Sequence, residues 1–152
     1  MASKALRVLA FAMNRRADGK IAEDEMCFVG FAGMIDPVRP EVAASIAECK
    51  RAGIKVVMIT GDHKQTATAI AKGIGILTNE SQAIDGAELD SLSDGQLAKR
   101  INSLTVFARV QPSDKMRIVK AFQSEGMVVA MTGDGINDAT AIKAADIAAV
   151  CP

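Results

Sequence analysis

The sequence predicts an α/β fold built on a doubly wound, mostly parallel sheet. Beyond Pro40, short β-branched runs alternate with helical patterns for more than a hundred residues, which is typical of strands joined by crossover helices. In addition, T-G-D-H-K-Q-T-A-T-A-I from Thr60 and T-G-D-G-I-N-D-A-T-A-I from Thr132 agree at seven of eleven positions, and each follows a strand pattern and opens a helix pattern. The same chemistry is therefore expected at two strand ends.

The N-terminal segment is predicted to be a hairpin. Two apolar runs, 6–13 and 26–35, flank a polar and acidic stretch, although the alanines of the first run leave a helix open there. D-P-V-R-P at 36–40 follows, and its two prolines hold the backbone extended. This segment is interpreted as a stiff junction between two structural units.

The remaining elements are predicted from apolar periodicity and from residues that start or stop helices. Pro40 suits a first helical turn, Gly53, Gly75 and Gly126 suit helix ends, and Ser93 begins a capping-box pattern with Gln96. The predicted strands cover 54–59, 105–110, 127–131 and 147–150, and the predicted helices lie within 40–53, 67–75, 93–101, 112–126 and 136–143.

Composition limits the classes of function. The 152 residues carry 18 Lys and Arg against 18 Asp and Glu, and no basic run occurs, so nucleic acid is not an expected partner. The longest uncharged run, 26–35, is half of the roughly 20 residues that a spanning helix needs, and no secretion signal opens the chain. Three scattered cysteines indicate buried thiols in a reducing compartment rather than a disulfide or zinc site.

The repeated Thr-Gly-Asp turn indicates a phosphate site. Ligands of doubly wound sheets bind beyond the carboxyl ends of the strands, where both turns are expected. At Thr60 and Gly61, a hydroxyl, a residue without a side chain and the free amides of a helix start form an anion cradle. For a single copy, a simple helix cap at Thr and Asp remains the alternative.

The second copy adds acidic residues that suit Mg²⁺. Asp134 and Asp138 are four residues apart with Asn137 between them, and carboxylates beside a phosphate are typical magnesium ligands. The alternative for Asp138 is an acid favoured by the helix dipole. Lys115 could supply a positive charge, although spacing alone favours a solvated surface lysine, and His63 is interpreted as a turn residue.

Four ordered motifs resemble the cytoplasmic catalytic portion of P-type cation-transporting ATPases, most of all the calcium-transporting branch. They are M-I-D-P-V-R-P-E-V, M-I-T-G-D-H, F-A-R-V-Q-P-S-D-K and M-T-G-D-G-I-N-D-A. The resemblance implies a haloacid dehalogenase-like fold. It also implies that 1–35 are the tail of the nucleotide-binding domain, 36–40 a hinge and 41–152 the phosphorylation domain.

The resemblance also implies a role for each matching residue. Such pumps transfer the γ-phosphoryl group of ATP to an aspartate and then hydrolyse the acyl phosphate, which drives ion movement. Thr60 and Gly61 would bind phosphoryl oxygens, with Asp62 near the nucleotide and metal. Lys115 would neutralise charge, Asn137 would support the phosphate, and Asp134 and Asp138 would serve Mg²⁺. Arg39 and Arg109 would help hold ATP at the domain junction.

One motif of the family is absent from the sequence. D-K-T-G-T, which carries the phosphorylated aspartate on the central strand, does not occur, so this chain is expected to be a fragment and inactive alone. Its implied partners are the rest of the pump, including that segment, the nucleotide-binding domain and the membrane helices, at the cytoplasmic face of a membrane. We expect the vacant position between 54–59 and 127–131 to be filled by rearrangement, by a segment such as 26–33 or by another chain.

Two departures from the family pattern affect the C-terminal end. Thr140 replaces a usual proline, and the ending A-A-V-C-P replaces a Gly-rich continuation, which affects the last helix and strand. A small-molecule phosphatase of the same superfamily is an alternative function, but it needs an Asp-x-Asp pair that the sequence lacks. A non-catalytic fragment that binds phosphate or Mg²⁺ is the other alternative.

Overall fold

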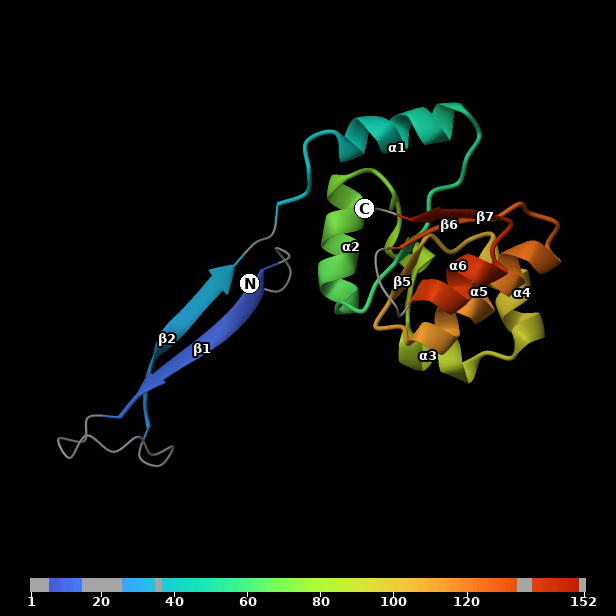
Figure 1. Cartoon of the computed structure of the whole chain (residues 1–152). Coiled ribbons are helices and arrows are strands. Elements are labelled where there is room, and N and C mark those ends of the chain that lie inside the picture. The colour runs from blue at the N-terminus through green and yellow to red at the C-terminus, as the bar shows by residue number, and fades with distance from the viewer. Residues whose placement is uncertain (1–5, 15–25, 35–36, 134–137, 151–152) are drawn as a thin grey trace.

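The computed structural model describes residues 6–14, 26–34, 37–133 and 138–150. Their elements run in the order β1 (Arg7–Met13), β2 (Cys27–Met34), α1 (Val42–Arg51), β3 (Met58–Ile59), α2 (Lys64–Gly73), the 3₁₀ turn η2 (Glu80–Gln82), β4 (Ala83–Asp85), α3 (Gly86–Ser91), α4 (Asp94–Ile101), β5 (Val106–Ala108), α5 (Pro112–Ser124), β6 (Ala130–Gly133), α6 (Ala139–Ala144) and β7 (Ile147–Val150). A hairpin is followed by an α/β body (Figure 1).

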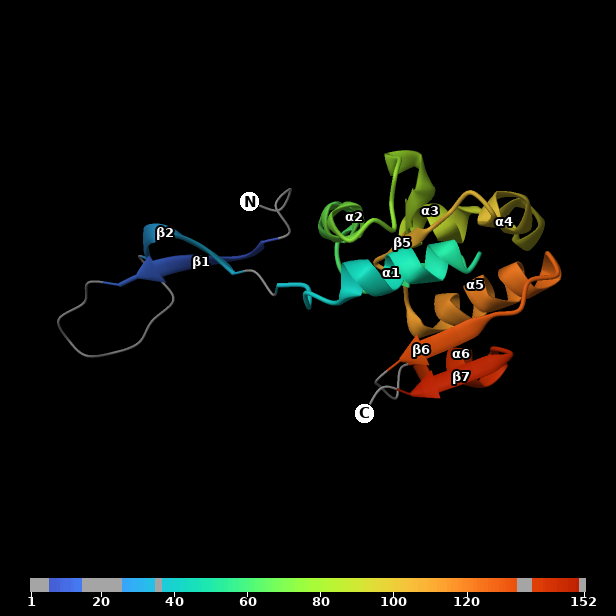
Figure 2. The same cartoon turned by 90° about the horizontal axis from the view of Figure 1, so that it is seen from above.

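The hairpin predicted for the N-terminal segment is present. β1 and β2 pair antiparallel, from Arg7 opposite Met34 to Met13 opposite Cys27, with an irregularity between Phe11 and Ala12. In both views the hairpin projects away from the α/β body (Figures 1 and 2). Its apolar side chains are largely exposed, which leaves this two-stranded ribbon without a core of its own.

The body contains two short parallel sheets. In the first the strand order is β3-β5-β4, and in the second β6 pairs with β7. Parallel strands joined by helices confirm the α/β fold predicted from the sequence. β7 forms at 147–150, as predicted, despite the unusual residues that follow it.

Helices cover both faces of the first sheet, which is the doubly wound arrangement. On β5, Phe107 packs into one apolar cluster, whereas Val106 and Ala108 pack into another, because alternate side chains of a strand point to opposite faces. The Phe107 face is covered by α3, α4 and α5, which contribute Leu89, Leu97, Ile101, Ile118 and Phe122. The other face is covered by α1 and α2, which contribute Ile46, Ala67 and Ala71.

Several predicted helix boundaries are confirmed. Gly53 and Gly126 adopt positive φ angles of 74° and 79°, which side-chain-bearing residues disfavour, just beyond α1 and α5. The capping box before α4 is also present. The Ser93 side chain accepts a hydrogen bond from the Gln96 amide at 3.3 Å, and the Gln96 side chain accepts one from the Ser93 amide at 2.8 Å.

Other boundaries differ from the prediction. β3 covers only 58–59 of the predicted 54–59, and β6 begins at Ala130 rather than 127. Both differences have one cause, since each strand pairs on one edge only, and pairing defines a strand. β4 and α3 are elements that no sequence pattern identified. α6 is described from Ala139, while 136 and 137 of the predicted helix lie outside the described residues.

The position of the missing strand is open in this structure. β3 pairs with β5 and β6 pairs with β7, so their other edges face a cavity of about 720 Å³ lined by both strands. The expectation that residues 26–33 fill this position is wrong, because those residues lie in β2 and pair with β1. Rearrangement of the body has not closed it either. Filling by another chain stays a prediction.

Candidate functional site

The first Thr-Gly-Asp turn follows β3 at the carboxyl edge of the first sheet. The Thr60 hydroxyl donates a hydrogen bond to Asp62 Oδ2 at 3.1 Å and accepts one from the Asp62 amide at 3.1 Å. These two bonds close the turn on itself. Gly61 between them is exposed, and a methyl group added at its Cα would meet no atom within 4 Å. The turn therefore leaves room for a ligand beside its backbone.

The turn is also tied to the end of β5. The Thr60 amide donates to Phe107 O at 2.9 Å, while the Arg109 amide donates to Asp62 O at 3.0 Å and the Val110 amide to Thr60 O at 3.4 Å. Arg109 is exposed and lies beside the predicted phosphate turn. The structure thus brings together Thr60, Gly61, Asp62 and Arg109 from two neighbouring strands.

Lys115 and Asp138 form a second group of predicted site residues. The Lys115 ammonium on the first turn of α5 donates to the Asp138 carboxylate, which lies immediately before α6. Their side chains are only 16% and 12% exposed, so the alternative of a solvated surface lysine is wrong. A methyl group added to Gly133 would lie 2.6 Å from Asp138 Cβ, which shows how closely β6 approaches this carboxylate.

The cavity between β3 and β6 reaches the Lys115–Asp138 pair. Val57 and Ile59 line one wall, Ala130 and Thr132 line the other, and both members of the pair also contact the cavity. Val42 and Ile46 of α1 cover one face, while Ile118, Val119 and Phe122 of α5 cover the other. The result is an apolar slot with a charged pair and the residue Thr132 at the carboxyl end of β6.

The backbone of the slot has the pattern of an unfilled parallel sheet. Met58 and Thr60 donate their amides towards β5, so the alternate residues Val57 and Ile59 direct their peptide groups towards the slot. On the other side, Val129 O accepts from the Asp146 and Ile147 amides, which turns the peptide groups of Ala130 towards the slot. One extended chain between the two edges could pair with both.

The remaining three predicted residues are Arg39, Asp134 and Asn137. Arg39 is exposed in the segment before α1, where its carbonyl accepts from the Val42 amide at 3.1 Å. Asp134 and Asn137 lie outside the described residues. Within the described ranges, no cluster of three or more His, Cys, Asp or Glu side chains suits a metal ion, and Asp138 is the member of the predicted magnesium pair that can be placed.

The sequence motifs predict the position of the slot but not all of the residues that line it. The absent motif predicts a vacant strand position here, but no sequence pattern gives Thr132 a role of its own, although it aligns with Thr60. The structure places Thr132 on the slot wall, near Lys115 and Asp138. The repeated turn was the signal that could have identified it. Chemically, a threonine and a lysine at the carboxyl end of an apolar slot suit an anionic group carried on an extended chain.

Comparison with known proteins identifies a family. Residues 9–146 match the profile of the haloacid dehalogenase-like hydrolases. The chain is 51% identical over 151 residues to calcium-transporting ATPase 1 of Bacillus cereus, 50% over 149 residues to calcium-transporting ATPase 1 of Lactococcus lactis, and 49% over 152 residues to the calcium-transporting ATPase of Bacillus subtilis. These matches confirm the resemblance that the four motifs indicated.

The relatives are much longer than this chain. Each match covers 95% or 97% of the chain but 17% of the relative. Among the helices of the described residues, none is both long enough and apolar enough to cross a membrane. The part of this chain that matches these relatives takes in both the hairpin and the helix-covered α/β body.

Proposed function

This chain belongs to the haloacid dehalogenase-like hydrolase family, and on that basis we propose that it is the phosphorylation-domain segment of a P-type cation pump. In the complete pump, ATP would phosphorylate an aspartate, and hydrolysis of the acyl phosphate would drive transport at the cytoplasmic face of a membrane. The observation that carries this proposal is the slot between β3 and β6, which ends at Lys115 and Asp138. Residues 1–35 and 36–40 would be the end of the nucleotide-binding domain and the hinge.

The partner that fits the slot is a single parallel strand from elsewhere in the pump. Such a strand would pair with the peptide groups of Ile59 on one side and Ala130 on the other. Running parallel to β3, it would deliver its carboxyl end to the Lys115–Asp138 pair. An aspartate at that end, as in D-K-T-G-T, would place its carboxylate beside the Lys115 ammonium.

Each group of residues has a distinct proposed role. The turn at Thr60 and Gly61, with its open space, would bind phosphoryl oxygens, and Asp62 would lie near the nucleotide and metal. Lys115 would hold the charge of the aspartate and of the incoming phosphoryl group. Arg109 would contact ATP from the end of β5. Arg39 would act from the junction, and Asn137 would support the phosphate.

The proposed cofactors are ATP and Mg²⁺. Carboxylate oxygens are the donors that Mg²⁺ prefers, and Asp138 supplies one at the carboxyl edge, close behind Gly133. Asp134, next to Gly133 in the sequence, is proposed as the second. When bound, the metal would neutralise phosphate charge. Because Asp138 is already paired with Lys115, this carboxylate would also orient the Lys115 ammonium beside the metal.

The pairing of Lys115 with Asp138 also supports an inactive isolated chain. With its ammonium held by a buried carboxylate, Lys115 has its charge balanced in the absence of an aspartyl strand. Phosphate binding without turnover is therefore the second candidate function for this chain alone.

Labelling with γ-³²P-ATP tests the proposal. The chain would be incubated with Mg²⁺ and labelled ATP, alone and with an apolar peptide that ends in D-K-T-G-T. We expect acid-stable, hydroxylamine-sensitive label on the peptide aspartate only when both are present. A peptide with Asn at that position and the Lys115→Ala variant are the matched controls, and both should abolish labelling. Labelling of the chain alone would falsify the fragment interpretation.

A further inference from the structure

Arg109 is held in an unusual backbone conformation beside the phosphate turn. Its φ angle is 51°, and it is the single residue other than glycine with a positive φ in the described ranges. A residue with a side chain disfavours this left-handed region, so the surrounding structure must maintain it. The conformation directs two successive amides, of Arg109 and Val110, to the carbonyls of Asp62 and Thr60.

Gly86, the first residue of α3, packs against the backbone of Arg109. β4 pairs parallel with β5, and Asp85 lies opposite Ala108. The residues that follow these two, Gly86 and Arg109, therefore also lie close together. A methyl group added to Gly86 would lie 2.4 Å from Arg109 O and 3.3 Å from Arg109 C. Real Cβ atoms do not approach backbone this closely. Only glycine therefore permits α3 to begin against the Arg109 carbonyl.

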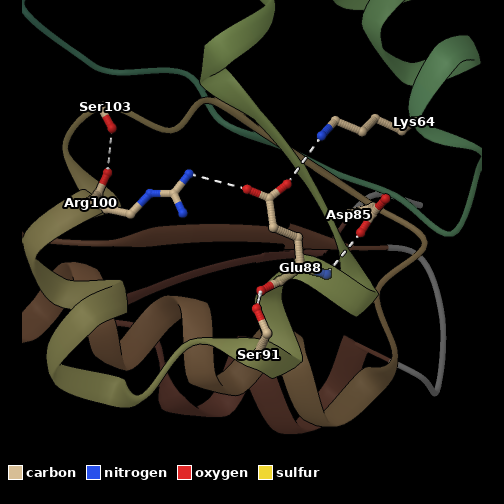
Figure 3. Close-up of polar contacts among 6 residues, drawn as sticks. All are labelled: Lys64, Asp85, Glu88, Ser91, Arg100 and Ser103. Carbon is tan, nitrogen blue, oxygen red and sulfur yellow. Dashed lines mark hydrogen bonds and ion pairs between the residues drawn. The ribbon is translucent and has the colours of Figure 1, made fainter.

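Glu88, two residues after Gly86, contacts the start of the helix that follows the phosphate turn at 60–62. Its carboxylate accepts from Lys64 at 3.2 Å and from Arg100 at 3.3 Å, as Figure 3 shows. Lys64 is the first residue of α2 and follows Asp62 by two positions. The Glu88 amide is itself held by the Asp85 side chain at 2.9 Å, which fixes the first turn of α3. Exposed ion pairs of this kind add little to the free energy of folding. Their relevant effect is to hold the start of α2 in place relative to α3.

We propose that Gly86 and Glu88 are positioning residues for the phosphate turn at 60–62. Gly86 supports the Arg109 conformation whose amides hold the turn, and Glu88 anchors the start of the helix that follows the turn. Neither touches the reacting groups. An effect of Gly86 and Glu88 on phosphoryl transfer rests on the proposed function. Their effect on the position of the turn does not, because it can be measured without any reaction.

Backbone hydrogen exchange of this chain tests the Gly86 part. In Gly86→Ala, we expect the Arg109 and Val110 amides to exchange about tenfold faster relative to the Ile118 amide in α5, because the added methyl group displaces the Arg109 carbonyl. The reference amide separates local opening from loss of global stability. Gly95→Ala is the matched control, since a methyl group there meets no atom within 4 Å.

Glu88→Gln tests the second contact without changing side-chain shape. We expect the amide resonances of 60–64 to shift and the Asp62 amide to exchange about threefold faster than in the wild type. Glu80→Gln is the control, because Glu80 pairs with Lys72 near the opposite end of the same helix at 2.6 Å. In the peptide-dependent labelling reaction, Glu88→Gln should raise the KM for Mg-ATP about threefold with little change in maximal rate.

The outcomes separate this proposal from the proposed function. If the wild-type Arg109 and Val110 amides exchange like those of an open loop, the proposal is wrong even if Gly86→Ala does not fold. It is equally wrong if Gly86→Ala leaves their exchange unchanged relative to Ile118, or if Glu88→Gln behaves like Glu80→Gln. Absence of any labelling in the wild type would contradict the proposed function alone, because the exchange results do not depend on turnover.

Discussion

The pair of Lys115 and Asp138 holds two opposite charges against each other with little access to solvent. Both side chains are nearly excluded from solvent, so each charge relies on the other in place of water. Sequence spacing alone favours a solvated lysine, because it does not show that the carboxylate just before α6 lies against the first turn of α5. The family motifs indicated the lysine's importance without indicating its partner.

We predict that Asp138→Asn lowers the free energy of unfolding by about 3 kcal/mol, because it leaves the Lys115 ammonium without a counter-charge. Urea denaturation would measure the change. The double variant Lys115→Met/Asp138→Asn should recover part of the loss, since no unpaired charge remains. Glu48→Gln, in the exposed pair with Arg51, is the control and should change stability by less than about 0.5 kcal/mol. If Asp138→Asn and Glu48→Gln lower the free energy of unfolding equally, Lys115 and Asp138 are not a buried pair.

At the scale of elements, sequence predicted best where a pattern is local. The hairpin, the capping box of α4 and the helix-ending glycines depend on neighbouring residues, and the structure confirms them. β4 and α3 escaped notice because three strand residues and six helical residues are too short for a periodic pattern. β3 and β6 are shorter than predicted because strand length depends on a partner that lies elsewhere.

The Asp146 side chain, just before β7, holds the backbone just before β6. Hydrogen bonds from the Val129 amide at 2.8 Å and the Gln123 side chain at 3.2 Å hold the pKa of Asp146 below its ordinary value. The resulting stability is complete above the unfolded pKa of about 3.9 and is lost as pH falls through the lower folded value. We predict that Asp146→Asn weakens the rise in stability between pH 2 and 5, as measured by urea midpoints. Parallel curves would contradict this role.

Among the described residues, most of the large exposed apolar side chains belong to the hairpin or line the slot. Nine of the large exposed apolar side chains belong to the hairpin: Val8, Leu9, Phe11, Met13, Met26, Phe28, Val29, Phe31 and Met34. Phe28 and Phe31 contact each other with ring centroids 4.9 Å apart. Sequence could predict this hairpin but not its exposure, because a strand pattern does not reveal whether its covering partner is present.

The hairpin should therefore promote association of the isolated chain. Val29→Lys/Phe31→Lys is predicted to reduce self-association in sedimentation velocity, because charge on a sheet surface opposes stacking and edge pairing. Val128→Lys, which places the same charge on another exposed apolar residue, is the control and should reduce association less. A monomeric wild type at concentrations near 100 μM would contradict the prediction.

The slot gives the whole molecule an incomplete sheet, and its completion should be measurable without any catalysis. A peptide that fills the space between β3 and β6 would bind the folded chain and not the unfolded one, so it should raise the free energy of unfolding by about 2.7 kcal/mol at 100 times its Kd. Thermal melts at increasing peptide concentration would measure this shift. A peptide with a central proline is the control, because proline cannot donate to the strand edge. If the two peptides shift the melting temperature equally, the ligand is not a paired strand. If neither shifts it, the slot does not accept one.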